Sequence, residues 1–286
     1  MNVFITGIRG FIAGRLNLSL QDQGYTISGS TSKTGEPMGR QPAGERIFHH
    51  KLGEPVDEAM FIGMDTVIHC AHDFQKGALK KNVEGTIAIA EAADKQGVGK
   101  QIFISSLSSR PDAQSEYGKA KFEIELYFKR NKGIIIRPGT VLGNGGIFGK
   151  MVRLVKGFPV VPLLDGGNSQ MYVIGVDDLC RSIYQVTKAN GNTFEYNLYY
   201  PEKVTLKEIL MAIRRLSGRH SILVPVPAAF LIMPLSFLNS LGIKLPVDID
   251  NLRGFIKSQT MIYQSDLQKV LHSYMSIEDI LKAEFD

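Results

Sequence analysis

Short apolar runs alternate with amphipathic stretches along most of the chain, and this alternation predicts the fold class. Apolar runs that read as strands cover residues 3–6, 24–31, 65–71, 100–106 and 134–138, with a short strand at 46–49. Helical spacing of apolar residues follows the first run and recurs over residues 79–95 and 115–130. Strands that are apolar throughout are typical of parallel sheets covered on both faces. We therefore expect a Rossmann-type α/β fold, a doubly wound parallel sheet that binds ligands beyond the carboxyl ends of its strands.

The first strand leads into a glycine turn that is typical of dinucleotide-binding βαβ units. Gly7 and Gly10 follow the strand, and Phe11 and Ile12 open the helix. Gly7 permits a tight turn, and Gly10 lets the backbone approach a pyrophosphate at the helix N-terminus, where N–H groups favour anions. The third small residue of the pattern is Ala13. Gly7, Gly10, Phe11 and Ile12 are predicted cofactor contacts, and Ala13 serves helix–strand packing.

The end of the second strand favours NADP(H) over NAD(H). An NAD site is expected to carry Asp or Glu there, to bind the ribose 2′-hydroxyl. This chain has Ser30, Thr31 and Lys33 instead, and Arg9 lies inside the glycine loop. A cation with small hydroxyl groups suits a 2′-phosphate. The alternative is that Arg9 and Lys33 are only exposed loop charges.

A candidate acid–base pair lies at the start of the helix predicted over residues 115–130. Tyr117 and Lys121 are four positions apart, so their side chains share one helix face. An ammonium beside a phenol is expected to lower the pKa of the phenol, which makes it usable in proton transfer near neutral pH. A serine at the end of the preceding strand could hold a substrate oxygen.

Several motifs occur in an order that resembles one known family, the extended short-chain dehydrogenase/reductases, which include NAD(P)-dependent sugar-nucleotide epimerases, dehydratases and reductases. The matching segments are Thr6-Gly7-x-x-Gly10-Phe11-Ile12, Asp65-x-Val67-Ile68-His69-x-Ala71, Asn82-Val83-x-Gly85-Thr86, Ile104-Ser105-Ser106, Tyr117-Gly118-Lys119-Ala120-Lys121, Arg137-Pro138-Gly139 and Val176-Asp177-Asp178-Leu179. The resemblance implies that Tyr117 is the catalytic acid/base and that Lys121 holds the nicotinamide ribose.

The same resemblance implies further cofactor contacts at Cys70, Ala71, Arg137 and Pro138. The chain departs from the family pattern at the active-site hydroxyl. The family's Ser or Thr usually falls at the position that Leu107 occupies here. We assign the role to Ser106, with Ser105 and Ser108 as alternatives. The stretch from this serine to Tyr117 is also short for the family, so the substrate pocket is expected to differ.

The resemblance also implies a division of the chain. Residues 1–175 mainly form the NAD(P)-binding domain, to which 176–200 return, and 143–172 with 201–286 mainly form a small substrate-binding lobe. Residues 221–243 contain no charged side chain, but prolines interrupt them, so we expect an apolar helix of the lobe and no membrane span. Asp177 and Asp178 are expected to begin a helix, and residues 267–285 to form polar, amphipathic surface helices.

Composition narrows the class of protein. The charged fraction is 21% and the net charge +5, with the basic residues scattered, so no nucleic-acid interface is predicted. Cys70 and Cys180 offer neither metal spacing nor a disulfide framework, which suits a reducing cytoplasm. No metal site is predicted. The first strand begins almost at Met1, so no leader peptide is expected.

These observations together favour an NADP(H)-dependent oxidoreductase of a nucleotide sugar, most simply a reductase of a 4-keto sugar. A preference for NADP(H) suits a reductase, which releases its oxidised cofactor after each turnover. No acid–base pair for dehydration is visible near Ser106, which argues against a dehydratase. Two alternatives stay open: an epimerase that retains its NAD(P), and a regulator that senses dinucleotides without catalysis. A homodimer is expected in each case.

Overall fold

The computed structural model describes residues 1–33, 46–189, 191, 193–227 and 264–285. Its centre is a seven-stranded sheet in the order β3-β2-β1-β4-β5-β6-β11, in which all neighbouring strands are parallel. The strands are β1 (Asn2–Thr6), β2 (Thr26–Thr31), β3 (Ile47–His49), β4 (Thr66–His69), β5 (Lys100–Ile104), β6 (Ile134–Pro138) and β11 (Glu195–Leu198). The predicted doubly wound fold is confirmed. The strand order reverses between β1 and β4, where such sheets bind their ligands.

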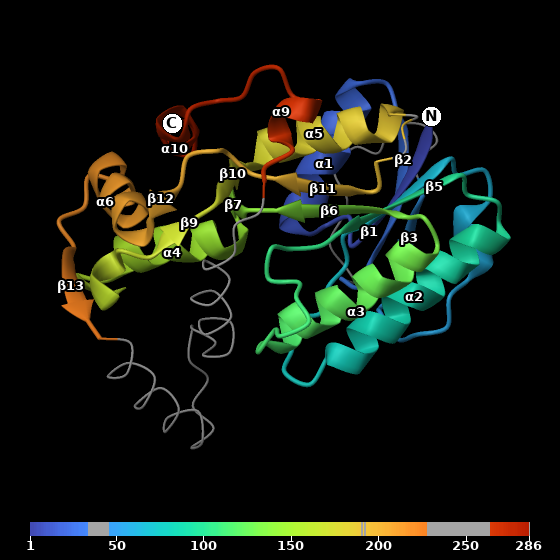
Figure 1. Cartoon of the computed structure of the whole chain (residues 1–286), viewed down its shortest axis with the longest axis horizontal. Helices are drawn as coiled ribbons and strands as arrows, with labels where there is room; N and C mark the ends of the chain where they lie inside the picture. Colours follow the sequence, from blue (N-terminus) through green and yellow to red (C-terminus); the bar gives the residue numbers. More distant parts are fainter. Residues whose placement is uncertain (34–45, 190, 192, 228–263, 286) are drawn as a thin grey trace.

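Helices cover both faces of the sheet (Figure 1). α1 (Phe11–Asp22) packs with α5 (Val176–Lys188) on one face, and α2 (Leu79–Lys95) packs with α3 (Glu116–Arg130) on the other. Leu16, Leu20 and Ile183 are buried on the first face, and Ile124 and Phe128 on the second. Helical spacing of apolar residues over 79–95 and 115–130 is what made α2 and α3 predictable.

A smaller group of elements lies beside the sheet (Figure 1). α4 packs on α6, and α6 also contacts α10. Short sheets join β7 to β10, β9 to β12 and β8 to β13. The elements outside the main sheet and its four helices are η1 (Glu58–Phe61), β7 (Thr140–Leu142), α4 (Gly146–Gly157), β8 (Val160–Leu164), η2 (Asp165–Gly167), β9 (Gln170–Met171), β10 (Val173–Gly175), β12 (Val204–Thr205), α6 (Leu206–Leu216), β13 (Ile222–Val226), α9 (Leu267–Val270) and α10 (Ile277–Ala283).

The prediction of an apolar helix over residues 221–243 is wrong at the start of that range. Ile222–Val226 is strand β13, which pairs in parallel with β8. Its Ile-Leu-Val-Pro-Val sequence is rich in β-branched residues, and proline is tolerated on a strand at the edge of a sheet. Residues 228–243 lie outside the described residues. No helix in the described ranges is long and apolar enough to cross a membrane.

Two acidic residues begin α5, as expected, but they do more than complement the helix dipole. Asp177 pairs with Arg15 of α1, with Oδ1 at 2.5 Å from Nε. Asp178 is buried and accepts hydrogen bonds from the Tyr200 hydroxyl at 2.5 Å and from the Met275 backbone N–H at 3.1 Å. These bonds tie the C-terminal segment to the main sheet.

The C-terminal segment forms two short amphipathic helices, as expected. Leu267 of α9 is fully buried where that helix packs on α5. Ile280 and Leu281 of α10, which contacts α6, are also buried. Each helix therefore buries its apolar face and leaves its charged residues at the surface.

Candidate active site

The turn after β1 is shaped so that two strand ends approach closely. Gly7 has φ +65°, and a Cβ there would lie 3.0 Å from Ala71 Cα. The Thr6 hydroxyl accepts hydrogen bonds from the backbone N–H groups of Cys70 and Ala71, each at 3.0 Å. The polar side chain at the end of β1 therefore fixes the end of β4. Of the predicted cofactor residues, the structure brings Gly7, Cys70 and Ala71 together.

The residues around this turn fit a bound dinucleotide. Gly10 is the N-cap residue of α1, and no side chain of the described residues caps the helix, so its first N–H groups face the turn. The Phe11 ring lies against the loop after β7, where a Cβ on Gly145 would come within 2.4 Å of it, and Ile12 packs against the core. These close approaches show that the glycines after β7 pack directly on the start of α1.

The end of β2 lies directly beside the glycine loop. The backbone N–H of Ile8 donates to the carbonyl of Ser30 at 2.9 Å, which places Arg9 next to this strand end. Ser30 and Thr31 are buried, and the Thr31 hydroxyl accepts a hydrogen bond from the backbone N–H of Lys33 at 3.2 Å. Lys33 itself is exposed. The hydroxyl groups of Ser30 and Thr31 and the cations Arg9 and Lys33 thus lie at the described end of β2.

The structure separates the three serines that follow β5. Ser106 forms a side-chain hydrogen bond with Tyr117, and its Oγ accepts the backbone N–H of Ser108 at 3.1 Å. Ser105 instead donates its hydroxyl hydrogen to Glu125 Oε1 at 2.5 Å, inside the protein. Ser108 contributes its backbone to this arrangement. Ser106 is the serine that faces Tyr117.

The loop reaches the helix because of Gly118. A Cβ at that position would lie 2.5 Å from the Ser108 carbonyl oxygen and 2.9 Å from Ala113 Cβ. The same turn is capped by Ser115, whose hydroxyl accepts from the Gly118 N–H at 3.1 Å. Glycine at this position therefore lets the loop of Ser106 pack directly on the start of α3.

Lys121 lies beneath Tyr117 and is buried. Its ammonium donates to the Ile104 carbonyl oxygen at 2.7 Å and lies 4.6 Å from the Phe103 ring centroid and 5.8 Å from that of Tyr117. Burial lowers the pKa of Lys121 to about 8, and the electrostatic effects of Cys70 and Glu125 offset only part of this lowering. The ammonium is thus close to losing its proton at mildly alkaline pH.

The expected lowering of the tyrosine pKa by this lysine is wrong. Burial raises the pKa of Tyr117, and the hydrogen bond from Ser106 offsets only part of that effect. The physical reason is that the phenolate would have to form out of water, at a distance from the ammonium where the attraction is too small to compensate. Tyr117 is therefore a protonated phenol at neutral pH.

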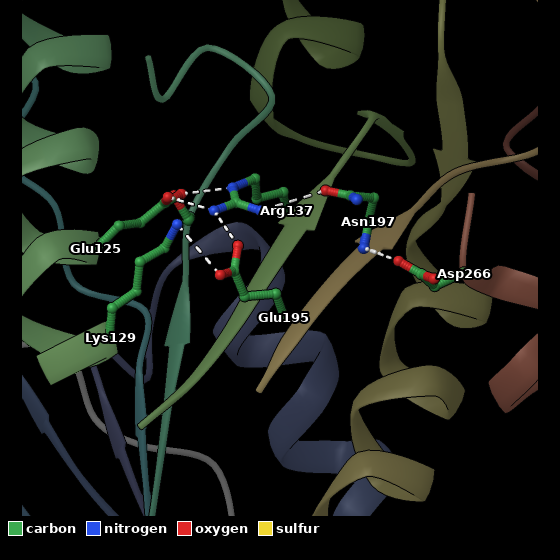
Figure 2. A network of polar contacts seen from close by, with 7 residues as sticks. Glu125, Lys129, Arg137, Glu195, Asn197 and Asp266 are labelled. Atoms are coloured by element: carbon green, nitrogen blue, oxygen red, sulfur yellow. Dashed lines mark hydrogen bonds and ion pairs between the residues drawn. The ribbon is translucent and has the colours of Figure 1, made fainter. Parts of the chain in front are cut away.

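Arg137 and Pro138 are both buried at the end of β6. The Arg137 guanidinium binds both Glu125 oxygens, with Nε at 2.8 Å from Oε1 and Nη2 at 2.5 Å from Oε2, and Nη2 also lies 2.7 Å from Glu195 (Figure 2). Burial alone would lower the pKa of Arg137, but these two carboxylates raise it. The Arg137 guanidinium is therefore held in ion pairs with Glu125 and Glu195. Pro138, the next residue of β6, pairs with Leu198 of β11.

Two aromatic residues next to Tyr117 were not anticipated from the sequence. The His72 ring meets the Tyr117 ring edge-on, with centroids 4.9 Å apart, and Phe74 stacks on Tyr117 at 5.9 Å while remaining 71% exposed. Both follow β4 in the segment His72-Asp73-Phe74. The available signal was their position directly after a strand end. Among the described residues, no group of His, Cys, Asp and Glu could hold a metal ion.

Comparisons with known proteins show which sequences and folds this chain resembles. The model of the NAD dependent epimerase/dehydratase family matches residues 3–198. No curated protein matches the sequence. Among solved structures, the UDP-glucose 4-epimerase of Thermotoga maritima with UDP-glucose is 18% identical, with a TM-score of 0.76 and coverage of 100% of this chain and 97% of that chain.

Two further structures are similar over most of their length. DesIV, a dTDP-glucose 4,6-dehydratase of Streptomyces venezuelae solved with NAD, is 19% identical with a TM-score of 0.67, over 90% of this chain and 96% of that chain. The Thermus thermophilus UDP-glucose 4-epimerase complex with NAD is 20% identical with a TM-score of 0.65, over 90% and 98%. At such identities these structures establish a shared fold.

Proposed function

The chain belongs to the NAD dependent epimerase/dehydratase family, and from this premise we propose that it is an NADP(H)-dependent reductase of a nucleotide sugar with a keto group at C4. The observation that carries the proposal is the contact of Ser106 with Tyr117 above a buried Lys121, at the carboxyl ends of parallel strands. A dinucleotide sensor without chemistry would not need this assembly.

The glycine turn supports a dinucleotide in this proposal. Gly7 and Gly10 would admit its pyrophosphate, and Ser30, Thr31 and Arg9 would surround the adenosine ribose. The nicotinamide supplies a hydride when the reduced cofactor is bound. We place the sugar nucleotide between this site and the smaller group of elements that contains α4 and α6.

The chain's own residues would manage the proton. Ser106 donates a hydrogen bond to the substrate's keto oxygen, and Tyr117 transfers a proton to the same oxygen as it becomes an alkoxide. Since the pKa of Tyr117 is raised, its phenol keeps its proton at neutral pH and is present in the form that can donate it. Lys121 stabilises the phenolate left behind and holds the cofactor's ribose.

A second candidate is an epimerase that keeps its cofactor and returns the hydride to the sugar. Its support is the likeness to the Thermotoga maritima UDP-glucose 4-epimerase over the full length of this chain. The two activities differ in cofactor use. A reductase releases its oxidised cofactor at each turnover, whereas an epimerase is purified with the dinucleotide bound and shows no net NADPH oxidation.

The test is NADPH oxidation with a panel of 4-keto nucleotide sugars. We expect Tyr117→Phe to lower kcat by about 100-fold or more, because the ring remains but the proton is lost. Ser106→Ala is expected to cost about 100-fold as well, since one positioned donor to the reacting oxygen is removed. The matched control is Ser108→Ala, which keeps the backbone N–H that Ser106 uses. Parental turnover by a folded Tyr117→Phe protein would rule out this mechanism.

A further inference from the structure

A buried carboxylate lies on the inner face of the helix that carries Tyr117 and Lys121. Glu125 follows Lys121 by one helical turn and is only 2% exposed. Its Oε1 accepts from Ser105 Oγ and from Arg137 Nε, and its Oε2 accepts from Arg137 Nη2, at 2.5, 2.8 and 2.5 Å (Figure 2). A buried charge is tolerated only with such partners. Glu125 therefore joins α3 to the ends of β5 and β6.

The contact with Ser105 has a direct bearing on the neighbouring residue. Ser105 immediately precedes Ser106, and its backbone N–H donates to the Ile136 carbonyl at 2.7 Å. The segment that presents Ser106 is thus held by the sheet through its backbone and by α3 through Glu125. The two elements joined by this carboxylate are those that carry the acid–base pair and the serine.

Glu125 also contributes to the electrostatic surroundings of Lys121. The groups that face the Lys121 ammonium are His69, Cys70 and His72 from β4 and the loop after it, the Ile104 carbonyl and Phe103 ring from β5, and Tyr117 and Glu125 from α3. Burial lowers the pKa of His69 and His72 to about 4 and about 3, and raises the pKa of Cys70 to about 12. These three groups are neutral at pH 7, which leaves Glu125 as the anion of this set.

We propose that Glu125 is a positioning residue of the active site, which holds the Ser106 segment against α3 and sustains the positive charge of Lys121. The proposal rests on the function proposed above for Ser106, Tyr117 and Lys121. It assigns to Glu125 no contact with substrate or cofactor. Its effects pass through Ser105 and through the electric field at Lys121.

The chain offers a matched control in the same network. Glu195 on β11 accepts from the same Arg137 Nη2 at 2.7 Å and also pairs with Lys129 at 3.1 Å (Figure 2). Its side chain is 41% exposed, and it binds Arg137 and Lys129 rather than Ser105. Glu195→Gln removes one charge from Arg137, as Glu125→Gln does, without touching the serine segment.

The experiment compares Glu125→Gln and Glu195→Gln with the parent protein in NADPH-dependent reduction across pH 6–10. For Glu125→Gln we expect kcat to fall roughly 10–100-fold, the scale of a small misplacement of reacting groups. The alkaline limb of its kcat profile is expected to move to lower pH, because loss of the Glu125 anion lowers the pKa of Lys121. Glu125→Asp should move the alkaline limb part of the way back toward its parental pH, since it restores the negative charge. Glu195→Gln should keep both kcat and profile.

A second readout separates this proposal from the proposed activity. In protein labelled at lysine Cε with 13C, the Lys121 signal, assigned with Lys121→Met, should titrate at lower pH in Glu125→Gln than in the parent. If the parent protein has no activity on the sugar panel but Lys121 still titrates at lower pH in Glu125→Gln than in the parent, the proposed reductase is refuted and the electrostatic role of Glu125 is supported. Circular dichroism and NADPH binding are the folding controls. Parental kcat, profile and lysine titration in a folded Glu125→Gln would overturn the proposal, as would equal losses in Glu195→Gln.

Discussion

Arg9 is the single side chain that bears most on cofactor choice. The bond from Ile8 N–H to the Ser30 carbonyl places it beside the end of β2, where Thr31 is buried and Lys33 is exposed. The described end of that strand, residues 30–33, offers no carboxylate. A guanidinium there can bind a phosphate with two parallel hydrogen bonds, which an ammonium cannot do.

We expect NADPH to bind more tightly than NADH, and Arg9→Ala to weaken NADPH binding by about 1.5–3 kcal/mol while leaving NADH nearly unchanged. Fluorescence titration of both cofactors measures this. Arg15→Ala is the control, because Arg15 lies on α1, directly after the turn that carries Arg9, but is exposed and paired with Asp177. Equal affinities for the two cofactors in the parent protein would refute a 2′-phosphate site.

At the level of secondary-structure elements, local patterns in the sequence were sufficient for α2, α3 and the strands from β1 to β6. Tyr117 and Lys121 were predicted to share a face because helix geometry alone decides it. The start of α3 was also readable, since Ser115 is a favoured N-cap residue and accepts the Gly118 N–H.

Contacts between distant elements could not be read in the same way. Glu125 meets Ser105, 20 positions away, and Arg137, 12 positions away, and only the fold decides those pairs. The direction of the Tyr117 pKa was missed because burial, which no local spacing reveals, outweighs the nearby cation. His72 and Phe74 were missed because a loop after a strand has no periodicity to interpret.

Close packing of the Ser106 loop on α3 is testable at Gly118. We expect Gly118→Ala to lower the free energy of unfolding by about 1–3 kcal/mol, because the new methyl group would overlap the Ser108 carbonyl oxygen at 2.5 Å. We also expect kcat to fall, since Ser106 moves with that loop. Urea unfolding and steady-state kinetics provide the measurements.

Gly149→Ala in α4 is the matched control for that substitution. Its Cβ would meet nothing closer than Arg153 Nη1 at 3.6 Å, so alanine should raise the free energy of unfolding by about 0.5–1 kcal/mol. If the two variants were equally stable, the close approach at Gly118 would not constrain the loop.

For the molecule as a whole, buried imidazoles make stability depend on pH. Burial lowers the pKa of His69 to about 4 and that of His72 to about 3, and it also lowers the pKa of His50. Below a pH of about 6.5, the pKa of a histidine in the unfolded chain, these histidines are protonated when the protein is unfolded but stay neutral when it is folded. The free energy of unfolding therefore falls as pH decreases, whereas it is insensitive to these groups above pH 6.5.

We expect the free energy of unfolding to decrease by at most about 1.4 kcal/mol per pH unit for each of His69 and His72 between pH 6.5 and 5. Urea unfolding at pH 7.5, 6.5, 5.8 and 5.0 tests this. His69→Gln should flatten the dependence, and His220→Gln, at an exposed position, should leave it as it is. A parent protein with equal stability at all four pH values would contradict the argument.

The shared arginine of Figure 2 also has a consequence for the order in which the chain assembles. Glu125 precedes Arg137 by 12 positions, whereas Glu195 is synthesised 58 positions later. Nascent chains fold from their N-terminal side, so β6 is the open edge of the sheet until β11 emerges from the ribosome. A strand edge exposed during synthesis invites pairing with other chains, and charged side chains discourage it. We expect the Arg137–Glu125 ion pair, which places two charged side chains beside that edge, to discourage pairing with other chains until Glu195 and β11 are synthesised.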